Sequence, residues 1–151
     1  MTYIKDGGAD AGIVPVPPLT RTDVALLLFF IFLGFFWIGL RLITGGRFVM
    51  PSPYMLLVFF IFAPVAEELF FRGLVQNWLK RRVTSIVFGV SGANVLASAL
   101  FAGVHIAGWG VEHGLMVFAP SLVIGFLYDR TGRVSFAILL HSIYNLNAAV
   151  V

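Results

Sequence analysis

Long apolar runs, separated by short stretches of polar residues and glycine, make up nearly all of the chain after residue 22. A helix that crosses a bilayer needs about 20 mainly apolar residues. We therefore expect an all-α fold, a polytopic integral membrane bundle of about five helical segments. The runs place these segments at Val24–Leu40, Tyr54–Lys80, within Val83–Ala107, at Leu115–Tyr128 and from Val134 to the end.

Polar residues and turn formers mark where these segments end. Thr22 or Asp23 can cap the first helix, and Arg41 can anchor its far end. The later runs are separated by three stretches rich in turn residues, at 44–53, 108–114 and 129–133. Residues 1–22 form a polar, Pro/Gly-rich tail, and residues 23–151 form one membrane unit without an internal repeat.

Composition supports a membrane protein. Hydrophobic residues make up 60% of the chain and charged residues 11%, and the mean hydropathy is +0.98. A soluble domain has about 45–50% apolar and about 25% charged residues, so a soluble fold could not bury this much apolar surface. The chain has no cysteine, which excludes a disulfide, a thiolate zinc site and a cysteine nucleophile.

Basic residues gather at the ends of the apolar runs, where they suit anionic lipid headgroups better than nucleic acid. With five spans, the tail and the loops after the second and fourth helices share one side. That side holds Lys5, Arg21, Lys80, Arg81, Arg82, Arg130 and Arg133, and the opposite side holds Arg41 and Arg47. The positive-inside rule then predicts a cytoplasmic N-terminus. We expect an integral protein of a bacterial inner membrane.

Three ionisable residues lie inside the second run, at Glu67, Glu68 and Arg72. A charge at mid-bilayer costs about 2.5–3.5 kcal/mol on insertion scales, so it persists when paired or functional. Glu68 and Arg72 are spaced i,i+4 and can pair, either as a structural clamp or as part of a site. Glu67 is rotated by about 100 degrees from Glu68, so it needs another partner.

Candidate partners occur in the later runs, at His105, His141 and Asn145. A lone histidine in an apolar helix is more often a core residue, but these groups lie on two further helices and could share one cavity with Glu67. Such a set could activate water with Glu67 as general base and hold an oxyanion with hydrogen-bond donors. Glu67, His105 and His141 could instead bind a metal.

The depth of His105 depends on where the third helix starts. Glu67 and His141 both fall near the middle of their segments. His105 matches that depth only if its helix starts late, with Val83–Gly89 lying along the interface. Glycines punctuate this stretch, and Ser or Asn can cap a helix, so we predict a start between Ser91 and Asn94.

Three short motifs resemble one family. EELFFR (Glu67–Arg72) matches an EExxxR motif, FAGVH (Phe101–His105) an FxxxH motif and HSIYN (His141–Asn145) an HxxxN motif. In this order and in separate apolar segments, they resemble the CAAX prenyl protease-like intramembrane proteases, also called the CPBP or abortive-infection family. The resemblance covers about Tyr54 to Val151.

The resemblance implies a role for each motif residue within a helical bundle whose active site lies in the bilayer. Glu67, assisted by His105, would activate the attacking water. Glu68 and Arg72 would hold the helix and polarise the site. The oxyanion would be stabilised by the last helix, through His141 and Asn145.

Members of this family are commonly classed as metalloproteases, although a metal-free, glutamate-dependent mechanism is also argued for them. Zinc on Glu67, His105 and His141 is one alternative. The helix-embedded HExxH arrangement of ordinary zinc proteases is absent from the sequence. We therefore prefer the metal-free mechanism.

Three functions fit these residues. The first is an intramembrane endopeptidase whose substrate is a membrane-embedded or lipidated peptide. The second is a non-catalytic subunit or assembly factor of a larger membrane complex, with the same fold. The third is an ion or proton pathway lined by Glu67, His105 and His141. The spacing of the motifs favours the protease, and membrane lipid is a partner in all three.

Overall fold

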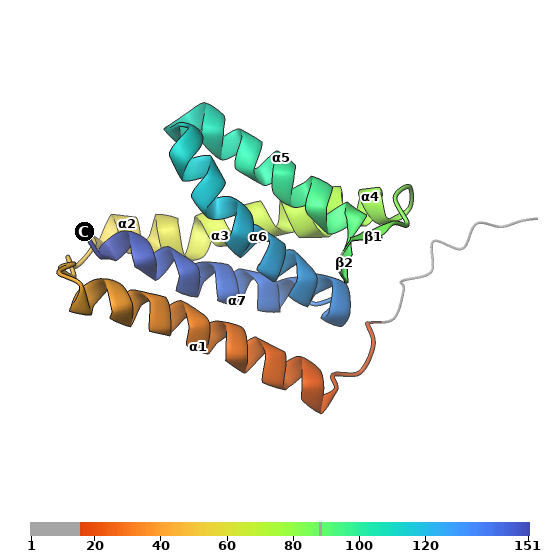
Figure 1. Ribbon diagram of the computed structural model, residues 1–151, viewed down its shortest axis with the longest axis horizontal. Coiled ribbons are helices and arrows are strands. Elements are labelled where there is room, and N and C mark those ends of the chain that lie inside the picture. The colour runs from red at the N-terminus through yellow and green to blue at the C-terminus, as the bar shows by residue number, and fades with distance from the viewer. Residues whose placement is uncertain (1–15, 88) are drawn as a thin grey trace, which may run out of the picture.

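The computed structural model describes residues 16–87 and 89–151, and the predictions made for residues 1–15, including Lys5, lie outside this part. The described chain is almost entirely helical (Figure 1). Its separate helices are α1 (Arg21–Ile43), α5 (Gly92–Trp109), α6 (Val111–Thr131), α7 (Val134–Asn145) and the 3-10 turn η3 (Leu146–Ala149).

One further helix runs without interruption from Pro53 to Lys80 and is called the motif helix below. It alternates between α-helical and π-helical pieces: α2 (Pro53–Leu57), η1 (Val58–Phe62), α3 (Ala63–Glu68), η2 (Leu69–Gln76) and α4 (Asn77–Lys80). A short hairpin of β1 (Ile86–Val87) and β2 (Val90–Ser91) connects it to α5. The helix prediction for this region is confirmed within one residue.

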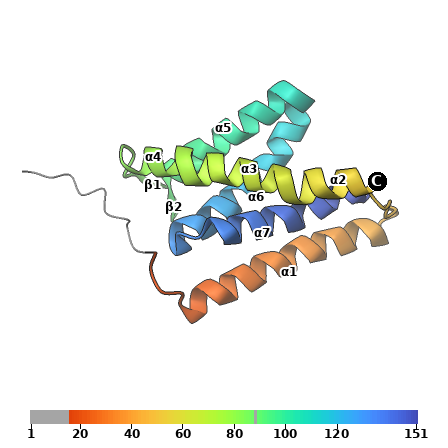
Figure 2. The ribbon, with the colours of Figure 1, turned by 180° about the vertical axis from the view of Figure 1, so that it is seen from behind.

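The helices are arranged in two parts. The motif helix, α7 and α1 lie side by side, with α7 in the middle, while α5 and α6 form a hairpin that crosses them at an angle (Figures 1 and 2). Four helices are long and apolar enough to cross a membrane, namely α1, the motif helix, α5 and α6, and Val134–Ala149 is a shorter apolar helix. The prediction of an all-α membrane bundle with about five segments is confirmed.

The first helix starts earlier than predicted. Thr20, and neither Thr22 nor Asp23, is the N-cap of α1. Asp23 occupies the third helical position, where its carboxylate accepts from the Thr20 backbone N–H at 3.1 Å while the Thr20 hydroxyl accepts from the Asp23 N–H at 3.1 Å. This reciprocal arrangement is a capping box, and it satisfies two backbone donors that a helix end leaves unpaired.

The start of α5 agrees with the prediction. Ser91 caps the helix by accepting from the Asn94 backbone N–H at 3.1 Å, and the helix begins at Gly92. The β1–β2 hairpin before it was not predicted. The break before α6 is much shorter than the predicted 108–114, because Gly110 alone, at φ +92°, reverses the chain direction. As a result α6 begins at Val111, four residues before the expected Leu115.

The basic residues of several loops gather at one end of the bundle, where α1 begins and α4 and α6 finish (Figure 1). Two ion pairs tie this end together. Lys80 of α4 pairs with Asp129 of α6 at 2.7 Å, and Arg130 of α6 pairs with Asp23 of α1 at 3.2 Å. At the other end, Phe48 and Val150 form an isolated β-bridge that joins the chain after α1 to the last residues.

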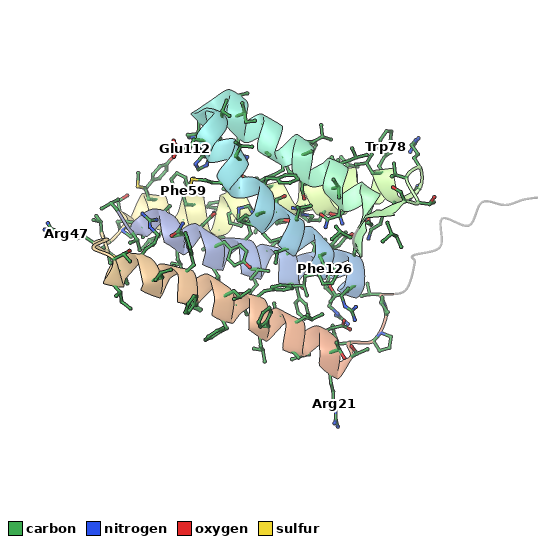
Figure 3. The ribbon with its side chains drawn as sticks, in the orientation of Figure 1. Arg21, Arg47, Phe59, Trp78, Glu112 and Phe126 are labelled. Carbon is green, nitrogen blue, oxygen red and sulfur yellow. The ribbon has the colours of Figure 1, made fainter. Side chains whose placement is uncertain are left out.

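Apolar side chains cover much of the outside, and polar side chains fill part of the inside, which is the distribution expected of a membrane protein. Phe32, Phe36 and Trp37 on α1 are more than half exposed. Figure 3 shows side chains of α1 extending away from the other helices. By contrast, five polar or charged side chains have no exposed surface: Glu68, Arg72, Gln76, Asn94 and Ser98. These buried groups must be hydrogen-bonded to one another, because there is no water in a bilayer core.

Candidate active site

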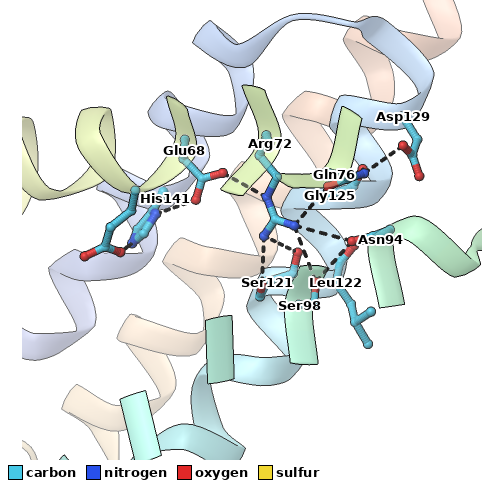
Figure 4. A network of polar contacts seen from close by, with 11 residues as sticks. Glu68, Arg72, Gln76, Asn94, Ser98, Ser121, Leu122, Gly125, Asp129 and His141 are labelled. Carbon is cyan, nitrogen blue, oxygen red and sulfur yellow. Dashed lines mark hydrogen bonds and ion pairs between the residues drawn. The ribbon is translucent and has the colours of Figure 1, made fainter. Parts of the chain in front are cut away.

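Glu68 and Arg72 form the predicted ion pair. Their closest atoms, Nε of Arg72 and Oε2 of Glu68, are 3.0 Å apart, and neither side chain is more than 1% exposed. The guanidinium also donates from Nη2 to the backbone oxygen of Ser121 at 2.9 Å and to its hydroxyl at 2.6 Å (Figure 4). Arg72 therefore joins the motif helix to α6.

The remaining nitrogen of Arg72, Nη1, faces a set of polar side chains that the sequence analysis did not assign to the site. It donates to Oε1 of Gln76 at 3.1 Å, to the Ser98 hydroxyl at 3.4 Å and to Oδ1 of Asn94 at 3.5 Å. Gln76 in turn donates to Asp129 at 2.7 Å (Figure 4). Arg72 thus has an acceptor for every donor direction that its planar guanidinium offers.

These extra residues carried a signal in the sequence. Gln76 follows Arg72 by four residues and Ser98 follows Asn94 by four, so each pair shares one helical face inside an apolar run. The sequence predicted no role for Asn94 except that of a helix cap. Its side chain instead donates to the Leu122 carbonyl at 2.9 Å and accepts from Ser98 at 3.1 Å.

His141 stands between the two glutamates. Its Nδ1 is 2.7 Å from Oε1 of Glu68, and its Nε2 is 3.6 Å from Oε2 of Glu67. A carboxylate accepts hydrogen bonds, so Nδ1 carries the proton in this contact. Arg72, Glu68, His141 and Glu67 consequently form a continuous polar chain from the buried network to a carboxylate that is 31% exposed.

We expected Glu67 to meet His105, and the structure pairs it with His141 instead. In residues 16–87 and 89–151, no hydrogen bond or ion pair joins Glu67 to His105. Phe101 links the two histidines, since its ring centroid lies 4.3 Å from that of His105 and 5.9 Å from that of His141.

His105 has a fixed orientation. Its Nδ1 donates to the carbonyl oxygen of Phe101 at 2.9 Å. A carbonyl oxygen can only accept, so Nδ1 carries the hydrogen and Nε2 of the neutral ring has a free lone pair. The ring also stacks on Trp109, with centroids 5.2 Å apart. His105 is therefore held as a proton acceptor at Nε2.

Asn145 contacts the motif helix at its first π-helical segment, η1. Its amide donates to the Phe59 carbonyl at 2.7 Å, and Ser142 donates to the Phe60 carbonyl at 2.8 Å. Pro64 has no N–H, so the motif helix lacks one backbone donor beside these two carbonyls. Residue 64 is the i+5 partner of Phe59 in a π-helix and the i+4 partner of Phe60 in an α-helix. Side chains of α7 thus supply hydrogen-bond donors to the motif helix beside Pro64.

One of three comparisons with known proteins identifies a family for the chain. A family model described as Rce1-like, type II CAAX prenyl endopeptidase Rce1-like, matches residues 49–147, about two thirds of the chain. The chain belongs to the Rce1-like family. No curated protein and no solved structure matches it. The matched range contains every residue of the polar chain from Arg72 to Glu67, together with His105 and Asn145.

As a member of the Rce1-like family, the chain is an integral membrane protein of a protease family. Its residues do not fit the zinc alternative, however. Nowhere in the described part do three or more histidine, aspartate or glutamate side chains converge as a metal would require. Nδ1 of His105 and Nδ1 of His141 both donate hydrogen bonds, so either ring could reach a metal only through Nε2. We derive no chemical step through a metal.

Proposed function

We propose that this protein is an intramembrane endopeptidase that hydrolyses a peptide bond of a membrane-embedded or lipidated substrate without a metal. The observation that supports it most is the arrangement of the adjacent glutamates. Glu68 is buried and neutralised by Arg72, whereas Glu67 is partly exposed and has only a long contact to His141. Glu67 is therefore the carboxylate that can reach a water molecule.

Glu67 acts as the general base in this proposal. A water molecule beside its carboxylate transfers one proton to Glu67 as the water oxygen bonds to the substrate carbonyl carbon. The carbonyl π bond opens, and its electron pair goes to the oxygen. His105 assists from the other side, because the lone pair on Nε2 can accept a hydrogen bond from the same water.

His141 and Asn145 stabilise the oxyanion. A hydrogen bond from His141 to the oxyanion would come from Nε2, because the buried Glu68 holds the ring through Nδ1 at 2.7 Å. One amide hydrogen of Asn145 is bound to the Phe59 carbonyl, which leaves the second hydrogen for the substrate. The intermediate collapses when the carbon–nitrogen bond breaks and the proton on Glu67 moves to the leaving amine. The oxyanion re-forms the carbonyl as the bond breaks, and the resulting carboxylic acid and amine exchange the second water proton to give a carboxylate and an ammonium group.

We also propose a topology. The end of the bundle that carries Arg21, Lys80, Arg130 and their neighbours would face the cytoplasm of a bacterial inner membrane, with the N-terminus on that side. Cysteines introduced at Arg81 and at Arg47 test this. The Arg81 position should be protected from an impermeant thiol reagent in intact cells, and the Arg47 position should react.

Purified protein in liposomes, mixed with membrane-embedded and lipidated peptides, tests the proteolytic activity. Wild type should cleave at least one peptide class, Glu67→Gln should not, and a chelator should have no effect. Glu112→Gln is the matched control, because Glu112 is an exposed glutamate at the start of α6. If Glu67→Gln cleaved as fast as wild type, the proposal would be wrong. Loss of cleavage on chelation would overturn its metal-free part.

A further inference from the structure

One histidine, His113, has not been assigned a role above. It lies outside the three motifs and next to the proposed site. It is in the first turn of α6, and its ring stacks on that of His105 with centroids 5.6 Å apart and planes inclined by 25°. It also lies 5.9 Å from the Trp109 ring. Nothing in the mechanism above uses His113.

Aromatic rings from two helices contact the partly exposed His105. Phe101 and Trp109, one turn before and one turn after it on α5, contribute centroid separations of 4.3 and 5.2 Å. His113 supplies the contact from α6. Offset aromatic contacts favour particular ring orientations. Together with the hydrogen bond from Nδ1 to the Phe101 carbonyl, they determine where the free Nε2 points.

The backbone is built to bring His113 to this position. Gly110 turns the chain within a single residue, so the first turn of α6 packs against the last turns of α5. Gly114 makes the close approach possible. A Cβ at Gly114 would lie 2.3 Å from Cγ1 of Ile106 and 2.8 Å from the Ala102 carbonyl oxygen. The residue next to His113 therefore allows the two helices to touch.

We propose that His113 is a positioning residue for His105. Its ring stacks on His105 from α6 and keeps His105 in the Nδ1–H form, with Nε2 directed at the attacking water. This role rests on the proposed function of Glu67 and His105. It needs a flat ring at residue 113 and does not need an ionisable one.

The kinetic test compares two substitutions in full-length protein in liposomes. His113→Leu removes the flat ring, and kcat should fall about 3- to 10-fold with little change in KM, the size expected when one aromatic contact is lost. His113→Phe keeps the ring and should recover kcat to within about twofold. Met116→Ala, an exposed residue of the same helix, is the control and should behave like wild type. Equal kcat for His113→Leu and wild type would overturn the proposal.

A second measurement does not depend on activity. Nitrogen-15 NMR of histidine-labelled protein reports which ring nitrogen of His105 carries the hydrogen. Wild type and His113→Phe should show a single Nδ1–H form, and His113→Leu should show a mixture of tautomers. An unchanged single form in His113→Leu contradicts the positioning role. If wild type cleaves nothing while these spectra follow the expectation, the protease proposal fails, and what stands is the effect of the His113 ring on the tautomer of His105.

Discussion

The His141 imidazole is held by Glu68, with 2.7 Å between Nδ1 and Oε1, although the two residues are 73 positions apart in the chain. The same carboxylate binds Arg72 through its other oxygen at 3.0 Å. Glu68 thus uses both oxygens for structure, and Glu67, one residue earlier, has its carboxylate partly exposed. Two adjacent and chemically identical side chains are suited to different tasks because one points into the bundle and the other toward its surface.

This division predicts opposite phenotypes for two isosteric substitutions. Glu67→Gln should abolish cleavage and leave the melting temperature in detergent nearly unchanged, because the side chain is 31% exposed and makes one long contact. Glu68→Gln should lower stability by about 3–5 kcal/mol, the usual cost of removing one partner of a buried ion pair. Thermal unfolding followed by circular dichroism, alongside the cleavage assay, checks both. Equal stability losses for the two variants would contradict the assignment.

Arg72 should not be replaceable by lysine. Its guanidinium contacts Glu68, Gln76 and Ser121 from different nitrogens, which a planar group with five donors can do. An ammonium keeps the charge but has three donors on one atom, so several buried acceptors would stay unpaired, at about 1–3 kcal/mol each. We expect Arg72→Lys to melt well below wild type.

Arg82→Lys is the control for this measurement. Arg82 lies two residues after the motif helix ends, where it is exposed and packs over the Trp78 ring at 3.9 Å. Its substitution should change the melting temperature little, because an exposed cation contact contributes only about 0.5–1 kcal/mol. Comparable melting temperatures for Arg72→Lys and wild type would show that charge alone holds the network.

Local helical geometry explains which parts of the site could be predicted. The Glu68–Arg72 pair depends on residues four apart in one helix, and spacing alone determines that contact. The start of α5 was predictable for a similar reason, because Ser91 caps the helix with its own side chain. Both features are set by a few neighbouring residues.

Contacts between helices depend on how each helix is rotated about its own axis, which the sequence predicts less well. Two π-helical segments of the motif helix, η1 and η2, lie on either side of Glu67 and Glu68 and change its number of residues per turn. Steps of about 100 degrees per residue therefore cannot be extended along it to decide which glutamate faces which histidine. For this reason the pairing of Glu67 with His141 was missed. The close approach of α6, at Gly125, to Asn94 and Arg72 also depends on how the helices pack.

Gly125 should tolerate no side chain. A Cβ at this position would lie 1.9 Å from Oδ1 of Asn94 and 2.8 Å from Nη1 of Arg72, inside the buried network. Overpacking a filled core typically costs about 1–3 kcal/mol, so Gly125→Ala should lower the melting temperature and weaken cleavage. Gly103→Ala is the matched control. A Cβ added at Gly103 would have no atom within 4 Å beyond its chain neighbours and its own helix backbone. That substitution should be neutral or slightly stabilising, by about 0.5–1 kcal/mol for a helical glycine.

Asn145 has two suggested roles, and a double-mutant cycle with Pro64 separates them. Asn145→Ala should destabilise wild type by about 1–3 kcal/mol, because the Phe59 carbonyl loses its donor. In a Pro64→Ala background, residue 64 regains an N–H that can serve this part of the helix. The same Asn145→Ala change should then cost less, and the difference is the coupling energy of the pair.

Cleavage rates from the same four proteins address the second role. If Asn145 also stabilises the oxyanion, its loss removes a donor to the transition state, and such donors contribute about 10²–10³ in kcat. Pro64→Ala would restore stability to the double mutant without restoring its rate. If the rate instead recovers together with stability, Asn145 serves only to satisfy the Phe59 carbonyl, and the oxyanion depends on His141 alone.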